Sequence, residues 1–200
     1  MISAARHRSP GPGRAVRSRA PGRRRAALAA GAAAVLAAAG GCTGFTPGNG
    51  ELTDDINVSS TLLMEGSTLP DAFTCRAEGG EAGSPPLQWS GQPEDIGSFA
   101  IVADDPASAE VFWVLFDLDP ATVEIRQDGV PQPAHSGENS FGDTGYTPPC
   151  PEEDDPHEYR FTVYALDQKL DLPQGAPLTD TLERISAHAV ARGSLTTAAE

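Results

Sequence analysis

The sequence predicts a mainly β fold, an antiparallel β-sandwich with a few peripheral helices, one of them near the C-terminus. Short segments rich in β-branched and aromatic residues indicate strands, and 21 Gly and 18 Pro in 200 residues supply many turns between them. Only one segment has a clear helical pattern. With 39% apolar and 21% charged residues, the composition excludes a coiled coil, a collagen and a polytopic membrane protein.

Four segments are expected to be strands. Residues 98–104 form a short apolar run that ends in an acidic residue, as a buried strand does, and residues 110–118 are rich in β-branched and aromatic side chains. Residues 159–166 alternate between apolar and polar types, and residues 56–59 fit a short early strand. Together they supply much of the sandwich.

A late helix is expected from about residue 180. Asp180 and Glu183 have the spacing of an N-terminal capping box, and Arg192 with Gly193 is a plausible stop. The apolar face of this helix would be formed by Leu182, Ile185, Ala189 and Val190.

Residues 126–159 have little strand pattern and many Gly and Pro residues. Long irregular segments inside compact domains are usually functional or disordered. Phe141 and Tyr146 suggest that this one packs against the domain, so we expect it to be functional.

Residues 1–50 contain eight Arg and no Asp or Glu, and a small-residue apolar run precedes Cys42. This order is typical of a secretory signal, although a disordered arginine-rich tail on a cytosolic protein is the alternative. The residues before Cys42 resemble a bacterial lipobox, with Leu36 further from the cysteine than usual. We therefore expect a signal peptide over 1–41, a lipidated Cys42 carrying acyl chains such as palmitate, and a tether over 42–52. The protein would then be an exported lipoprotein of the cell membrane that faces outward.

The other 150 residues contain six Lys and Arg against all 28 acidic residues. Such a body repels phosphate backbones and anionic lipid surfaces, so nucleic-acid binding is not expected and membrane contact would come through the lipid anchor alone. Cys75 and Cys150 remain after Cys42, and in an oxidising compartment they would form a disulfide; two buried free thiols are the alternative. No cysteine or histidine spacing indicates a metal site.

Several short motifs occur in a specific order along the chain. They are Leu-Pro-Asp-Ala-Phe-Thr-Cys at 69–75, Ser-Pro-Pro-Leu-Gln-Trp-Ser-Gly at 84–91, Asp-Asp-Pro at 104–106, Gly-Tyr-Thr-Pro-Pro-Cys-Pro at 145–151 and His-Glu-Tyr at 157–159. This series resembles the phosphatidylethanolamine-binding protein (PEBP) family, in particular its bacterial YbhB/YbcL type, also called Raf kinase inhibitor-like proteins. The resemblance covers residues 53–195 and leaves 196–200 as a tail. It implies a Greek-key β-sandwich with a small surface pocket for an anion, such as phosphate or a phospholipid headgroup.

Five residues match the family's pocket motifs. Asp105 and Pro106 correspond to an Asp-Pro turn, Trp113 to a tryptophan that follows a pocket histidine, and His157 and Tyr159 to a Gly-x-His-Arg-Tyr segment. The resemblance implies that these side chains surround the ligand.

Four positions depart from the pattern. Ala107 and Ala109 stand where the family has a second Asp and a second Pro, Phe112 replaces the histidine before Trp113, and Glu158 replaces the arginine. An anion pocket needs N–H or O–H donors and gains from positive charge. Phe112 removes a donor, and Glu158 would repel an anion if its side chain faced the site.

We therefore expect a binding protein with a partly degenerate pocket, formed by Asp105, Pro106, Phe112 and Trp113 together with His157 and Tyr159. The alternative is a protein–protein module that inhibits a kinase or a protease, as relatives of this family do. No nucleophile elbow, phosphate loop or metal cluster is recognisable, so neither an enzyme nor a cofactor is expected.

Overall fold

The computed structural model describes residues 52, 56–151 and 157–199. The predicted signal peptide, Cys42, nearly all of the tether and the acidic run at 152–155 lie outside the described residues. All described residues belong to one compact unit, Thr46–Glu200. Within these residues, no helix combines the length and the apolar character that a membrane crossing requires.

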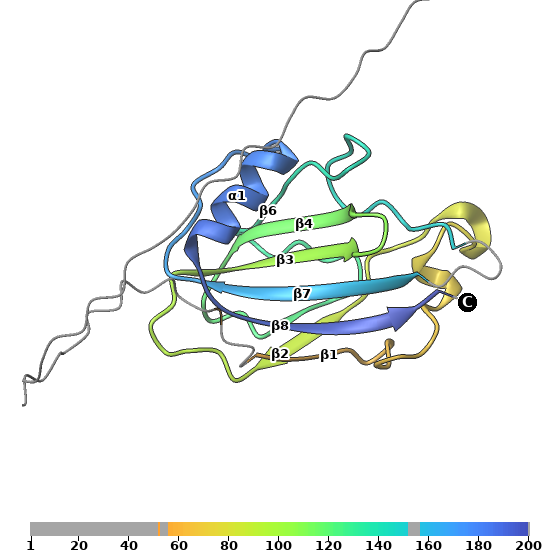
Figure 1. Cartoon of the computed structure of the whole chain (residues 1–200), viewed down its shortest axis with the longest axis horizontal. Helices are drawn as coiled ribbons and strands as arrows, with labels where there is room; N and C mark the ends of the chain where they lie inside the picture. The colour runs from red at the N-terminus through yellow and green to blue at the C-terminus, as the bar shows by residue number, and fades with distance from the viewer. Residues whose placement is uncertain (1–51, 53–55, 152–156, 200) are drawn as a thin grey trace, which may run out of the picture. The chain divides into compact units, whose positions relative to one another are not determined.

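The main element is a five-stranded antiparallel sheet whose long strands β4, β3, β7 and β8 lie side by side (Figure 1). In sheet order its strands are β6 (His135–Ser136), β4 (Glu110–Leu118), β3 (Ser98–Asp105), β7 (Glu158–Leu166) and β8 (Ala189–Ala198). The predicted limits of β3, β4 and β7 agree with the structure to within one residue.

A second, three-stranded antiparallel sheet packs against one face of the first. Its order is β1 (Asn57–Ser59), β2 (Leu87–Ser90) and β5 (Glu124–Ile125). Trp89 of β2 meets Phe99 of β3 edge to face, with 5.3 Å between ring centroids. The prediction of a mainly antiparallel β fold with few helices is confirmed.

Strand β3 has an almost continuous apolar sequence because both of its faces are covered. Phe99 and Ile101 face the small sheet and join the larger core, whereas Ala100 and Val102 face the other way and pack into the cluster beneath the helix. A strand covered on one side alone would alternate between apolar and polar residues. The five-stranded sheet is therefore the central layer, with the small sheet on one face and α1 on the other.

Helix α1 (Leu178–His188) begins and ends earlier than predicted. Its N-cap is Pro177, which has no side-chain cap, and Asp180 lies within the first turn, so the predicted capping box is wrong. Asp180 instead places negative charge near the N-terminal end of the helix dipole. The helix ends at His188, and the chain continues directly into β8.

Strand β8 was missed in the sequence and extends the domain. It runs to Ala198, Thr197 within it is fully buried, and Thr68 forms a parallel bridge with Ala198. Residues 196–198 are therefore not a tail, because they pair with the start of β7. Two short 3-10 helices, Asp71–Phe73 and Glu78–Gly80, complete the elements described.

Candidate functional site

Asp105 ends β3 and uses its two carboxylate oxygens for two purposes. Oδ1 accepts hydrogen bonds from the backbone N–H groups of Ala107 (2.8 Å) and Ser108 (3.2 Å), and so holds the turn between β3 and β4. Oδ2 contacts Nδ1 of His157, which lies just before β7. Asp105 therefore has the expected turn role and also contacts a second of the predicted site residues.

The environment of Asp105 favours its ionised form. Burial raises the pKa of this carboxyl group, but the hydrogen bonds from His157, Ala107 and Ser108 outweigh that effect, so its pKa lies below the ordinary value. The His157 side chain is 29% exposed against 4% for that of Asp105. A buried carboxylate thus orients a histidine that solvent and ligands can reach.

A β-bulge places Phe112 and Trp113 on the same side of β4. Ala103 pairs with Trp113 and Asp104 pairs with Val111, so Phe112 has no opposite residue on β3. Neighbouring residues of a regular strand point to opposite faces, and an extra residue removes this alternation. Both aromatic side chains therefore enter the larger core.

Phe112 is the centre of an aromatic cluster behind the site. It makes edge-to-face contacts with Tyr146, Tyr159 and Phe161, at centroid distances of 5.9, 5.8 and 5.9 Å. Tyr146 donates its hydroxyl hydrogen to the carbonyl of Phe73 at 2.5 Å, and burial raises the pKa of that hydroxyl. The residue that replaces the family's histidine is thus a packed core side chain, only 2% exposed.

The irregular segment after β6 is held over the site by Asn139. Its Oδ1 accepts from the N–H groups of Phe141 (2.9 Å) and Asp143 (3.1 Å), and its Nδ2 donates to Oγ1 of Thr147 (2.7 Å). The N–H of Thr147 donates to the carbonyl of Phe112 at 2.9 Å. The expectation that this stretch packs against the domain is correct.

A disulfide joins the same segment to the chain before β2. Cys75 and Cys150 are bonded, with Cα atoms 5.1 Å apart, so the predicted bridge is confirmed. The N–H of Cys75 also donates to the carbonyl of Pro149 at 3.0 Å. The covalent link thus fixes one wall of the site.

These residues enclose a cavity of about 350 Å³, the Asp105 cavity. Its walls are formed by Asp105, Glu110, Phe112, Phe141, Thr147, Pro148, Pro149, Cys150, His157 and Tyr159. Four of the six predicted site residues therefore meet there. Pro106 is exposed on the turn and Trp113 is buried in the core, and neither lines the cavity.

The charge of this cavity differs from what the sequence suggested. Glu158 is exposed at the start of β7 and is not part of the wall, whereas Glu110, at the start of β4, is. No lysine or arginine is among the described residues that line it. Glu110 gives no signal in the sequence, because it looks like an ordinary exposed residue at the end of a strand. Phe141 and Thr147 could have been predicted as wall residues, since they belong to the segment expected to be functional.

Chemically, the cavity offers carboxylates, a histidine and aromatic faces. His157 and Asp105 form a pair that could bind or orient a polar group, and Thr147 and Tyr159 carry hydroxyls. Among the described residues, no group of three or more His, Cys, Asp or Glu side chains is placed to hold a metal ion.

The sequence matches the family profile described as phosphatidylethanolamine-binding protein over residues 59–200. A UPF0098 protein of Methanothermobacter thermautotrophicus is 34% identical over 148 residues, which cover 70% of this chain and 95% of that protein. LppC of Mycobacterium tuberculosis, named as a candidate lipoprotein, is 32% identical over 146 residues, 71% of each chain.

Solved structures agree with this match. E. coli YbcL, described as a new member of the mammalian PEBP family, superposes with a TM-score of 0.66 at 27% identity and covers 73% of this chain and 98% of its own. A Chlamydia trachomatis PEBP homologue gives a TM-score of 0.64 at 28% identity, over 74% of this chain and 99% of its own. The chain therefore belongs to the phosphatidylethanolamine-binding protein family.

Proposed function

We propose that this protein is a binding protein whose Asp105 cavity holds a small phospholipid-headgroup ligand that carries an amine as well as a phosphate. The observation that carries this proposal is the charge of the cavity wall. Asp105 and Glu110 supply two carboxylates, and no arginine or lysine among the described residues balances them. A bare anion would meet repulsion in such a site, whereas an ammonium group would be attracted.

The aromatic side chains support the same ligand class. Phe112, Phe141 and Tyr159 line the cavity beside the carboxylates. The faces of aromatic rings attract cations, and the attraction is worth about 0.5 to 2 kcal/mol depending on how far the cation is desolvated. Aromatic rings next to carboxylates form a common environment for organic ammonium groups.

The phosphate of such a ligand would need hydrogen-bond donors. His157, Tyr159 and Thr147 carry N–H and O–H groups in the wall of the cavity. The family's name refers to phosphatidylethanolamine, whose headgroup carries both an amine and a phosphate.

A pair of matched variants tests the proposal. Glu110→Gln removes a charge from the cavity wall, and Glu158→Gln removes the same charge from an exposed position outside it. In thermal-shift titrations with phosphoethanolamine, we expect Glu110→Gln to weaken binding by about 1.4- to 5-fold, because ion pairs of exposed groups are worth about 0.2 to 1 kcal/mol. Glu158→Gln should have no effect. Equal effects of the two variants, or no stabilisation of the wild type, would contradict the proposal.

We also propose that the protein is anchored in the cell envelope through Cys42. The small residues before this cysteine and the name of the LppC relative support anchoring. Expression of the full chain in an actinobacterial host with a clickable palmitate analogue should label the wild type and leave Cys42→Ala unlabelled and released from the membrane fraction. Labelling that survives Cys42→Ala would contradict it.

A further inference from the structure

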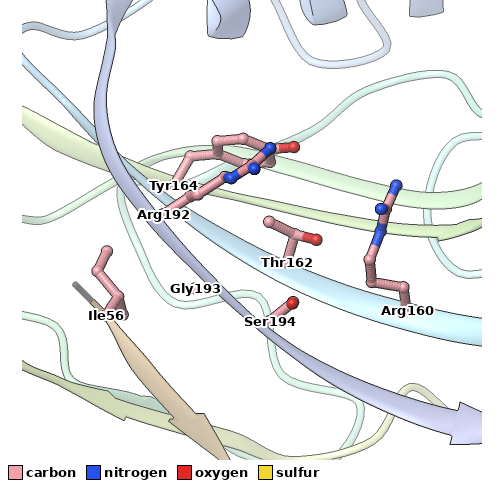
Figure 2. Close-up of a pocket in the computed structure, with 7 residues that line it drawn as sticks. All are labelled: Ile56, Arg160, Thr162, Tyr164, Arg192, Gly193 and Ser194. Carbon is pink, nitrogen blue, oxygen red and sulfur yellow. The ribbon is translucent and has the colours of Figure 1, made fainter. Parts of the chain in front are cut away.

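A second cavity, of about 330 Å³, opens on one face of β7 and β8 and shares no lining residue with the Asp105 cavity. We call it the Arg192 cavity; Figure 2 shows the residues that line it, which are Ile56, Arg160, Thr162, Tyr164, Arg192, Gly193 and Ser194. No part of the proposed function uses it.

Strand register explains why these side chains share one face. Across the pair β7–β8, Tyr164 is opposite Arg192 and Thr162 is opposite Ser194. Alternate residues of a strand point to the same side, so Arg160 projects with them (Figure 2). Tyr164 also packs against the cluster beneath α1, which identifies this side as the helix-bearing face of the sheet.

The edge of the cavity is closed by the chain that leads into β1. The N–H of Ile56 donates to the carbonyl of Arg192 at 3.2 Å. A Cβ atom on Gly193 would lie 1.7 Å from the carbonyl oxygen of Ile56, so only glycine allows this close approach. The hydrogen bond and the close approach together hold the backbone of Arg192 and Gly193 against the chain that leads into β1.

Two positive charges meet here in a strongly acidic domain. Residues 51–200 contain six Lys and Arg, and two of them, Arg160 and Arg192, line this one cavity. Burial and Asp104 raise the pKa of Tyr164, while both arginines lower it, which places the two guanidinium groups within electrostatic range of the same hydroxyl.

Arg160 is held in place without being hidden. Its Nε donates to Oδ1 of Asp104 at 3.0 Å and its Nη2 donates to Oδ2 at 2.5 Å, while its side chain stays 40% exposed. These bonds use two of the five N–H donors of a guanidinium group. A fixed guanidinium loses less conformational entropy when it binds a further partner.

We propose that the Arg192 cavity binds a small phosphate-bearing anion between Arg160 and Arg192, with the hydroxyl of Ser194 as a further donor. Paired guanidinium groups and hydroxyls are the usual partners of phosphate oxygens. The site is independent of the Asp105 cavity, whose wall is acidic. The protein would then carry two sites of opposite charge preference.

The test is a residue-resolved NMR titration of the full chain with inorganic phosphate and, separately, glycerol phosphate, at constant ionic strength. Residue resolution is needed because the eight arginines of residues 1–50 also attract phosphate. We expect saturable shifts of the Thr162, Gly193 and Ser194 amides. The probe that binds more tightly shows whether free phosphate or a phosphomonoester headgroup is preferred.

Matched variants make the test specific. Arg192→Gln should weaken binding about tenfold, since a charge-assisted hydrogen bond contributes more than a neutral one. Arg126→Gln removes the same charge from an exposed position after β5 and should change binding less than twofold. Non-saturable shifts with both probes, shifts centred on Asp105 and His157, or equal losses in Arg192→Gln and Arg126→Gln would overturn the proposal.

Discussion

Asp105 and His157 lie 52 residues apart in the sequence, and their side chains meet in the wall of the Asp105 cavity. The other oxygen of Asp105 holds the turn that leads into β4. One carboxylate therefore couples the local geometry of the β3–β4 turn to the position of the histidine.

Asp105→Ala is expected to destabilise the fold by about 1 to 3 kcal/mol, because it leaves the turn amides and His157 without their acceptor. Asp119→Ala is the control: Oδ1 of the exposed Asp119 accepts from the N–H of Ala121 at 2.8 Å, and this is the one hydrogen bond that its side chain makes to the described residues. Urea denaturation should show a clearly smaller loss for Asp119→Ala. Equal losses would mean that the contact with His157 adds nothing to stability.

The contribution of Asp105 should depend on pH. Its pKa is lowered in the folded state, so the stability that it provides is complete above the unfolded value near 3.8 and is lost as the pH falls through the folded value. The difference in unfolding free energy between wild type and Asp105→Asn should be constant above about pH 5 and should shrink below about pH 4. A difference that grows on acidification would contradict the direction of the shift.

Removing the Cys75–Cys150 disulfide should cost about 4 kcal/mol in the chain-entropy account, because the bridge spans 75 residues. The double variant Cys75→Ser, Cys150→Ser should also weaken ligand binding at the Asp105 cavity, since Cys150 is part of its wall. Denaturation of oxidised and reduced protein measures the first effect, and calorimetry measures the second. Cys42→Ser should leave the stability unchanged.

Phe112→His would restore the donor that the family places before the tryptophan. We expect phosphate to bind more tightly, because the imidazole adds an N–H group to the wall, and the fold to lose stability, because Phe112 packs against three aromatic rings. Phe141→His adds the same group at a position that is 52% exposed and should give a smaller gain. Phosphate titrations of the two folded variants check this. An unchanged phosphate affinity in folded Phe112→His would contradict it.

Of the strands that the sequence predicted well, β3 and β4 are covered on both faces, whereas β7 was predicted from its alternation of apolar and polar residues. β3 and β4 are long, apolar and rich in bulky side chains. Such a run can be predicted to be a strand without knowing which other strands it pairs with. β8 was missed because Arg192 and Gly193 read as a helix stop; its inward residues include Ala191 and Gly193, too small to produce a strong alternation.

The site was predicted in outline and missed in its charge. The resemblance to the family's motifs was enough to identify Asp105, Phe112, His157 and Tyr159 as wall residues. The bulge that turns Trp113 into the core depends on the register between β3 and β4, which no local pattern reveals. Glu110 joins the wall only because the segment after β6 folds back over the start of β4.

The most direct measurement of the central proposal is a calorimetric titration of the wild-type protein with phosphoethanolamine and with inorganic phosphate at equal ionic strength and pH, each competed against ethanolamine. The account predicts that phosphoethanolamine binds in the Asp105 cavity more tightly than phosphate does and that ethanolamine displaces it. If phosphate binds there as tightly as phosphoethanolamine and ethanolamine displaces neither, the cavity is an anion site and the account is contradicted.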